Sequence, residues 1–161
     1  MCICTYHAQQ PAYGKPAMSF PSNCTCFRLR RAARQVSQVY DRELAAVDLS
    51  LNEYSILRRA EPQPRTLGEL ATTVGMDRST LNRNLKPLIE AGWLKEMRGE
   101  DARHRVIAIT TSGRKRIAKA MPHWQSAQQR LQALYGEAAT LRLNADLDAL
   151  DQALNLPGAE A

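Results

Sequence analysis

A run of short polar and basic side chains after Asp77 has the chemistry needed to bind double-stranded DNA. An arginine guanidinium pairs with both major-groove acceptors of guanine, and an asparagine amide pairs similarly with adenine. Hydroxyl groups suit phosphate oxygens, which fix the register of a protein on the duplex without reading sequence. We expect base contacts from Asn82 and Arg83 and phosphate contacts from Ser79 and Thr80. The candidate contacts of this run are Arg78, Ser79, Thr80, Asn82 and Arg83.

A second basic group lies in a polar segment between two strand candidates, residues 93–98 and 105–109. The second candidate is rich in β-branched residues, which favour strands. The pair therefore predicts a hairpin with its tip at residues 99–104. Arg103 at the tip suits the minor groove, where the negative potential is high, and Asp101 can hold its guanidinium. Arg98 and Arg105 add positive charge along the hairpin.

The elements that must position these groups begin with Thr66, which with Glu69 predicts a capping box and a short helix. Gly75 supplies a tight turn, because glycine adopts positive φ without steric cost. Asp77 is the expected cap of a second helix that ends at Gly92. Two short helices joined by a glycine turn form a helix-turn-helix, and the following hairpin makes it winged. We expect DNA binding between Thr66 and Thr110.

Longer helices are expected on both sides of this unit. Apolar spacing predicts one helix at about residues 23–46, and Ser50 with Glu53 predicts a capping box for the next. A long helix is expected from Thr111, with Pro122 as a potential kink, and a final one after Gly136. The first helix and the last two carry more apolar surface than one small subunit can bury. They pack either in a homodimer with two-fold symmetry or on the chain's own winged unit.

The predicted fold class is mainly α with a small β-wing. We expect a disordered tail at residues 1–22, a helical dimerisation region at 23–48 and 111–155, a winged helix-turn-helix lobe at 49–110, and a C-terminal tail at 156–161. The formal net charge of +6 favours polyanionic partners. We expect a cytoplasmic protein that does not bind membranes, because neither a bilayer-spanning run nor a secretory signal is visible. Motifs of enzymes are not found either, so we expect no catalytic activity and no cofactor.

Several segments resemble the MarR family of bacterial transcriptional regulators over roughly residues 24–155. The most specific are Asp-x-Arg in the hairpin and the Thr-Thr-Ser-Gly that follows it. The resembling segments are Leu67-Gly-Glu-Leu-Ala71, Met76-Asp-Arg-Ser-Thr-Leu81, Leu88-Ile-Glu-Ala-Gly-Trp-Leu94, Asp101-Ala-Arg-His-Arg105 and Ile109-Thr-Thr-Ser-Gly113.

The resemblance implies a homodimer that binds a palindromic operator, usually as a repressor, and is released by a small organic ligand or by oxidation. By position, it implies recognition-helix contacts from Ser79, Thr80 and Arg83 and a wing contact from Arg103. Asn82 stands where many members carry threonine, and Pro87 is not a general family feature. The alternative is a winged-helix module that binds another protein rather than DNA.

Two cysteines, Cys24 and Cys26, stand at the predicted start of the first helix. A helix N-terminus favours the thiolate, which is the form that oxidants attack. Cys26, with Tyr40 fourteen residues later, is similar to the cysteine and tyrosine of the organic-hydroperoxide-sensing branch, although Leu51 replaces that branch's second tyrosine. The other reading of Cys26 is a small buried apolar residue in the dimer interface. Cys2, Cys4 and His7 form too loose a group to predict a metal site.

A small-molecule effector is the second expected signal. In the family that the sequence resembles, the ligand cleft lies between the dimerisation helices and the DNA-binding lobe. Aromatic or hydrogen-bonding side chains suit such a cleft, and an arginine of the first helix suits a carboxylate. The alternative for each aromatic candidate is a role in the core, which is the more frequent place for such side chains. The candidate lining is Arg34, Tyr40, Tyr54, His123 and Trp124.

Overall fold

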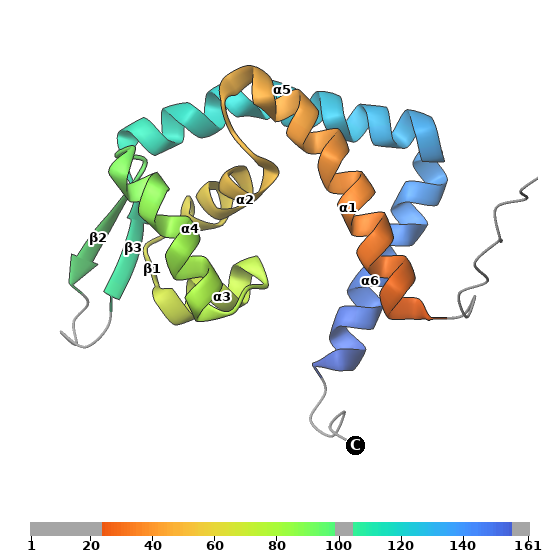
Figure 1. Ribbon diagram of the computed structural model, residues 1–161, viewed down its shortest axis with the longest axis horizontal. Coiled ribbons are helices and arrows are strands. Elements are labelled where there is room, and N and C mark those ends of the chain that lie inside the picture. Colours follow the sequence, from red (N-terminus) through yellow and green to blue (C-terminus); the bar gives the residue numbers. More distant parts are fainter. Residues whose placement is uncertain (1–23, 99–104, 156–161) are drawn as a thin grey trace, which may run out of the picture.

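The computed structural model describes residues 24–98 and 105–155, which form helices and one small sheet (Figure 1). In chain order the elements are α1 (Thr25–Leu44), the 3-10 turn η1 (Ala45–Val47), α2 (Leu51–Ala60), β1 (Arg65–Thr66), α3 (Leu67–Val74), α4 (Arg78–Glu90), β2 (Leu94–Arg98), β3 (Arg105–Ile109), α5 (Thr111–Tyr135) and α6 (Glu137–Leu154). The sheet is antiparallel, with strand order β1-β3-β2.

The long helix α5 joins two parts of the molecule. Figure 1 shows α2, α3, α4 and the sheet gathered near its start, and α1 and α6 towards its other end. Helix α1 packs along α5, and α6 turns back from it at Gly136. This arrangement is mainly α with a small β-wing, as predicted. None of the helices in the described segments has the length and apolar character needed to cross a bilayer.

The two predicted capping boxes are both present. Ser50 Oγ accepts from the Glu53 backbone N–H at 3.2 Å, and Glu53 Oε2 accepts from the Ser50 N–H at 2.8 Å. Thr66 and Glu69 repeat this exchange at the start of α3, with the same two distances. Each box satisfies N–H groups that the first turn of a helix leaves without a partner. The sequence therefore fixes where α2 and α3 begin.

The turn between α3 and α4 also follows its prediction. Gly75 ends α3 with a left-handed φ of 74°. Asp77 then caps α4, and its Oδ1 accepts from the Thr80 N–H at 2.8 Å. Pro87 lies inside α4 without ending it; a proline has no N–H, so the hydrogen bond to the carbonyl of Arg83 cannot form. The helix-turn-helix is thus complete.

Two boundaries and one strand differ from the sequence expectation. The first helix ends at Leu44 rather than near residue 46, because the chain tightens into η1 and Asp48 adopts a left-handed φ of 48°. Strand β2 begins at Leu94, since the Trp93 N–H donates to the Leu88 carbonyl and completes the end of α4. Strand β1, two residues long with Arg65 paired to Ile107, was not predicted from the sequence.

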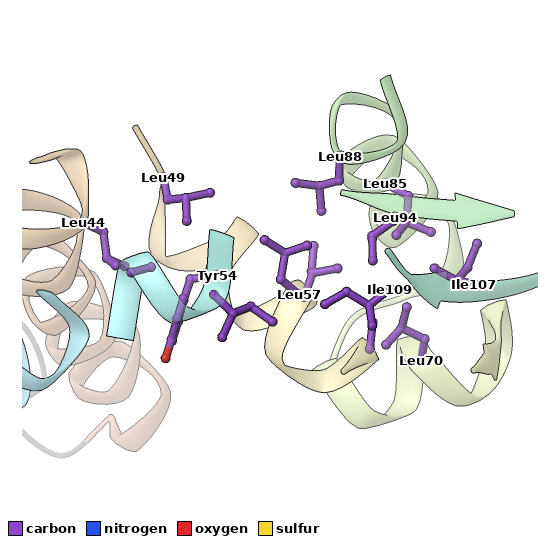
Figure 2. Packing of buried hydrophobic residues seen from close by; sticks show 14 of the residues in the cluster. Leu44, Leu49, Tyr54, Leu57, Leu70, Leu85, Leu88, Leu94, Ile107 and Ile109 are labelled. Atoms are coloured by element: carbon purple, nitrogen blue, oxygen red, sulfur yellow. The ribbon is translucent and has the colours of Figure 1, made fainter. Parts of the chain in front are cut away.

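One hydrophobic core runs through the winged lobe and into the helices beyond it. Figure 2 shows Leu85, Leu94 and Ile107 meeting between α4 and the sheet, with Leu57 of α2 beside them. The cluster continues through Tyr54 to Leu44 of α1. This core fixes the face of α4 that is buried, and so the face that remains exposed.

The far end of the molecule leaves apolar side chains in solvent. Leu134 is 73% exposed because it lies in the last turn of α5, beyond the buried stretch that ends at Ala127. Helix α6 buries only Thr140. The exposed large apolar residues of α1, α5 and α6 are Phe27, Leu29, Leu134, Tyr135, Leu141, Leu143, Leu147, Leu150 and Leu154.

Candidate nucleic-acid interface

Helix α4 exposes the polar residues predicted to contact DNA. Leu81, Leu85 and Leu88 are fully buried, so the helix is anchored by one apolar face. Asn82 and Arg83 lie on the exposed side. Arg83 Nη2 donates to the Thr80 hydroxyl at 3.2 Å, one turn earlier. The start of α4 therefore presents a guanidinium, an amide and hydroxyls on one solvent-facing surface.

The cap of α4 also organises its first turn. The Ser79 hydroxyl donates to Asp77 Oδ1 at 2.6 Å, beside the Thr80 N–H. These hydrogen bonds, led by that of Ser79, hold the pKa of Asp77 well below its usual value. Asp77 thus stays ionised and keeps the Ser79 side chain at the helix start.

Arg78 lies apart from this group. A Cβ added to Gly68 would come within 3.1 Å of Arg78 Nη2, so the guanidinium rests on the first turn of α3. Gly68 leaves the space for it. Arg78 is therefore adjacent in sequence to the other predicted contacts, but its side chain lies against α3, the first helix of the helix-turn-helix.

The hairpin meets α4 through Arg105. Its Nη1 donates to Asn82 Oδ1 at 2.8 Å, and its Nε donates to Glu96 Oε2 at 3.1 Å. A second bond joins Arg105 Nη2 to Glu96 Oε1. Between the helix and the hairpin lies an open groove of about 440 Å³ lined by Asn82, Arg83, Lys86, Ile89, Glu90, Glu96 and Arg105.

Lys86 and Glu96 were not among the predicted site residues. Glu96 pairs across the hairpin with Ile107, and Arg105 stands two residues before Ile107 on the same strand. Diagonal neighbours of this kind share a face of the sheet. Pairing Arg98 with Arg105 across the predicted hairpin would have placed Glu96 beside Arg105 and identified it as a site residue. Of the other predicted wing residues, Arg98 is the last residue of β2, and the structure describes its backbone only. Asp101 and Arg103 lie outside the described residues.

Three of the predicted effector residues form one aromatic cluster. The Trp124 ring lies 6.1 Å from the Tyr40 ring and 6.3 Å from the Tyr54 ring, measured between centroids. The Tyr40 hydroxyl donates to Gln128 Oε1, and the Tyr54 hydroxyl lies 3.7 Å from Met121 Sδ. Burial raises the pKa of both tyrosines. The cluster joins α1, α2 and α5.

The sequence signal missed Met121 and Gln128, although helical spacing from Trp124 points to both, at three residues before and four after. Arg34 is exposed on α1, and His123 is half-buried beside Trp124 in sequence. Neither has a described contact with the aromatic cluster within residues 24–98 and 105–155.

The two candidate redox cysteines are both exposed. Cys24 is the N-cap residue of α1, and Cys26 lies in its first turn. Helical rise separates Cys26 from Tyr40 by about 21 Å, so the two cannot touch within one chain. Cys2, Cys4 and His7 lie outside the described residues. Within those residues, no group of His, Cys, Asp and Glu is arranged to hold a metal ion.

A helix-turn-helix with an exposed polar second helix and an adjoining hairpin defines a winged-helix protein. No protein-family model matches the sequence. The crystal structure of the transcriptional regulator MosR of M. tuberculosis, in complex with DNA, is 36% identical with a TM-score of 0.71, covering 83% of this chain and 99% of that chain. The repressor CouR, bound to a 23-mer DNA duplex, is 26% identical with a TM-score of 0.75, covering 83% and 96%.

A curated relative is an HTH-type transcriptional regulator of Bacillus subtilis, YwoH, 24% identical over 100 residues that make up 62% of this chain and 73% of that protein. The chain belongs to the MarR family of DNA-binding transcriptional regulators. The family expected from the sequence motifs is therefore confirmed.

Proposed function

We propose that this protein is a homodimeric repressor that binds a palindromic operator in double-stranded DNA. The observation that carries the proposal is the exposed polar side of α4 beside the hairpin, with Arg83 and Arg105 on the same groove. In a helix-turn-helix, the second helix enters the major groove with its first residues towards the bases. The relatives MosR and CouR, both solved with DNA, support the same mode of binding.

The proposed contacts with DNA are of two kinds: some bind phosphates and add affinity, and others bind bases and read the sequence. Arg83 pairs with a guanine, while Ser79 and Thr80 bind phosphates through the hydroxyls that line the start of α4. Arg103 enters the minor groove and is oriented by Asp101. Arg78, resting on Gly68, contributes positive charge from the side of α3 and does not reach a base.

The proposed dimer interface is the apolar surface of α1, α5 and α6. Large exposed apolar patches on a small protein mark interaction sites, and this one lies away from the α4 groove. A second copy related by a two-fold axis would cover the same residues on both chains. The same axis would place two α4 helices on the two halves of a palindrome.

Release from the operator is proposed to act through the helices that set the spacing of the two lobes. One route is a small aromatic ligand that inserts beside Trp124, where α1, α2 and α5 meet, with Arg34 as a partner for a carboxylate. A structure of CouR from Rhodococcus jostii RHA1 holds p-coumaroyl-CoA, which supports the ligand route. The other route is oxidation of the exposed Cys24 and Cys26.

Single arginine substitutions test the groove model. DNA upstream of the protein's own gene is the probe, measured by fluorescence anisotropy at physiological salt. Arg83→Ala and Arg103→Ala should each weaken binding by about tenfold or more, because each removes a contact worth about 1–3 kcal/mol. Lys119→Ala removes one exposed positive charge from α5 and should leave binding nearly unchanged. If neither arginine variant binds more weakly than Lys119→Ala, the groove model is wrong; if wild type does not bind the DNA at all, the alternative of a winged-helix module for protein interaction is favoured.

A further inference from the structure

Arg105 connects the hairpin to the recognition helix through two different acceptors. Its guanidinium binds the Glu96 carboxylate side-on through Nε and Nη2, and the remaining Nη1 reaches Asn82 Oδ1 at 2.8 Å. Side-on pairing fixes the plane of a guanidinium, so the direction of its third nitrogen is fixed as well. Glu96 therefore determines where Arg105 meets Asn82.

This contact determines how the Asn82 amide is presented. Arginine has only donors, so the Asn82 atom facing it must be the oxygen. The Nδ2 group is the other branch of the amide and has no described partner within residues 24–98 and 105–155. Bidentate pairing with adenine requires that the oxygen accept from the base while Nδ2 donates. The Arg105 cation takes one of the two lone pairs of the Asn82 oxygen and disfavours a second donor there, so Nδ2 is the group that Asn82 offers to a base.

We propose that Glu96, acting through Arg105, makes Asn82 select guanine rather than adenine in the operator. Guanine offers two acceptors in the major groove, N7 and O6, whereas adenine offers N7 beside a donor. Asn82 Nδ2 and the Arg105 guanidinium are both hydrogen-bond donors, so together they suit the two acceptors of guanine. The proposal rests on the proposed DNA binding and adds a positioning residue, on the wing, to the reading of a base by the helix.

Stability does not account for this network. The side chains of Arg105 and Glu96 are 45% and 43% exposed, and ion pairs that are so exposed contribute little to folding. A carboxylate in the groove also opposes DNA binding, because it repels phosphates. Because Glu96 serves neither stability nor affinity, its role is to orient the Arg105 guanidinium. That orientation acts on the choice of base rather than on the affinity for DNA.

Glu96→Gln removes the charge while keeping the shape of the side chain. Glu90→Gln is the matched control, since Glu90 lines the same groove but pairs with Lys86, at 3.9 Å. Wild type and both variants are each used to select from a library of double-stranded DNA with a randomised core. Bound sequences are counted, thermal unfolding of each protein is recorded, and affinity for unselected duplex is measured.

The wild-type protein should enrich guanine at one position of each half-site. Glu96→Gln should lose about five- to tenfold of that preference in favour of adenine, while its affinity for unselected duplex rises and its thermal unfolding is unchanged. Glu90→Gln should show the rise in affinity without the change of base. Unchanged base preferences in Glu96→Gln, or an equal change in Glu90→Gln, would overturn the proposal. A wild-type protein that enriches no sequence would instead refute DNA recognition itself.

Asn82→Ala separates action through Asn82 from a direct effect of Arg105. In the Asn82→Ala background, Glu96→Gln should no longer change the base preference, because the amide that it orients is gone. A shift of the same size in both backgrounds would show that Arg105 reads the base alone and would contradict the role of Asn82.

Discussion

Gly113, at the start of α5, lies directly against the backbone carbonyl of Trp93. A Cβ on Gly113 would be 2.2 Å from the Trp93 oxygen and 2.8 Å from the Ile109 side chain. The Thr110 hydroxyl donates to the Gly92 carbonyl at 2.7 Å and accepts from the Gly113 N–H at 3.0 Å. This close approach packs the start of α5 against the segment that follows α4.

Gly113→Ala should therefore destabilise the protein strongly. The clash is with backbone, which cannot move as a flexible side chain can, so we expect a loss of about 3 kcal/mol in the free energy of unfolding. Urea denaturation followed by circular dichroism measures the loss. Ser112→Ala, one residue earlier and exposed, should change the free energy by less than about 0.5 kcal/mol. Equal stability of the two variants would contradict the close packing at Gly113.

The buried tyrosines predict a loss of stability in alkali. Burial raises the pKa of Tyr40 and Tyr54, so the folded protein holds both protons more tightly than the unfolded chain. Their contribution is complete below pH of about 10, the pKa in the unfolded chain, and is lost as the pH rises through the folded pKa. Tyr54→Phe should reduce this fall in the free energy of unfolding. Equally steep curves for wild type and Tyr54→Phe would contradict the account.

The apolar surface of α6 predicts a dimer that one charge can disrupt. Leu147 is 40% exposed in the single chain and lies on the stripe with Leu143 and Leu150. Leu147→Glu should shift the protein to a monomer in sedimentation velocity and reduce operator affinity at least tenfold, because a buried unpaired charge is costly. Gln152→Glu adds a charge elsewhere on α6 and should remain dimeric. A Leu147→Glu variant that sediments like wild type would refute this interface.

Oxidation through the N-terminal cysteines predicts release by peroxide. Hydrogen peroxide oxidises a thiolate to a sulfenic acid and is itself reduced to hydroxide, and the exposed Cys26 is open to this reaction. Wild type should lose its bound operator after peroxide treatment, and reduction with dithiothreitol should restore binding. Cys26→Ser should keep the operator, and Cys24→Ser is the neighbouring control. Release that is equal in wild type and Cys26→Ser would exclude Cys26 as the sensor, and no release from wild type would remove oxidation as the signal.

Local signals in the sequence determine much of the fold. Ser50, Thr66 and Asp77 cap their helices as predicted, because each cap needs only residues within one turn. Strand β1 could not be predicted, since its two residues are defined only by pairing with β3. The 73% exposure of Leu134 depends on how the helices pack together, and residue spacing within one helix does not contain that information.

The candidate site shows the same division. Asn82 and Arg83 follow from the position of the Asp77 cap, and the structure places both on the exposed side of α4. The bonds that tie Arg105 to Asn82 and Glu96 depend on packing of the hairpin against the helix, across 23 residues of sequence. The separation of Cys26 from Tyr40, in contrast, follows from helical rise along the helix that the sequence already predicts at about residues 23–46.

Selection of genomic DNA fragments by the purified wild-type protein tests the central claim most directly. Fragments retained at physiological salt are sequenced and compared. The account predicts a shared inverted repeat whose half-sites lie about one helical turn apart, because two α4 helices of a symmetric dimer read it. Binding should also weaken steeply as salt rises. Fragments that share no sequence, or that share a single half-site without its inverted copy, would contradict the account.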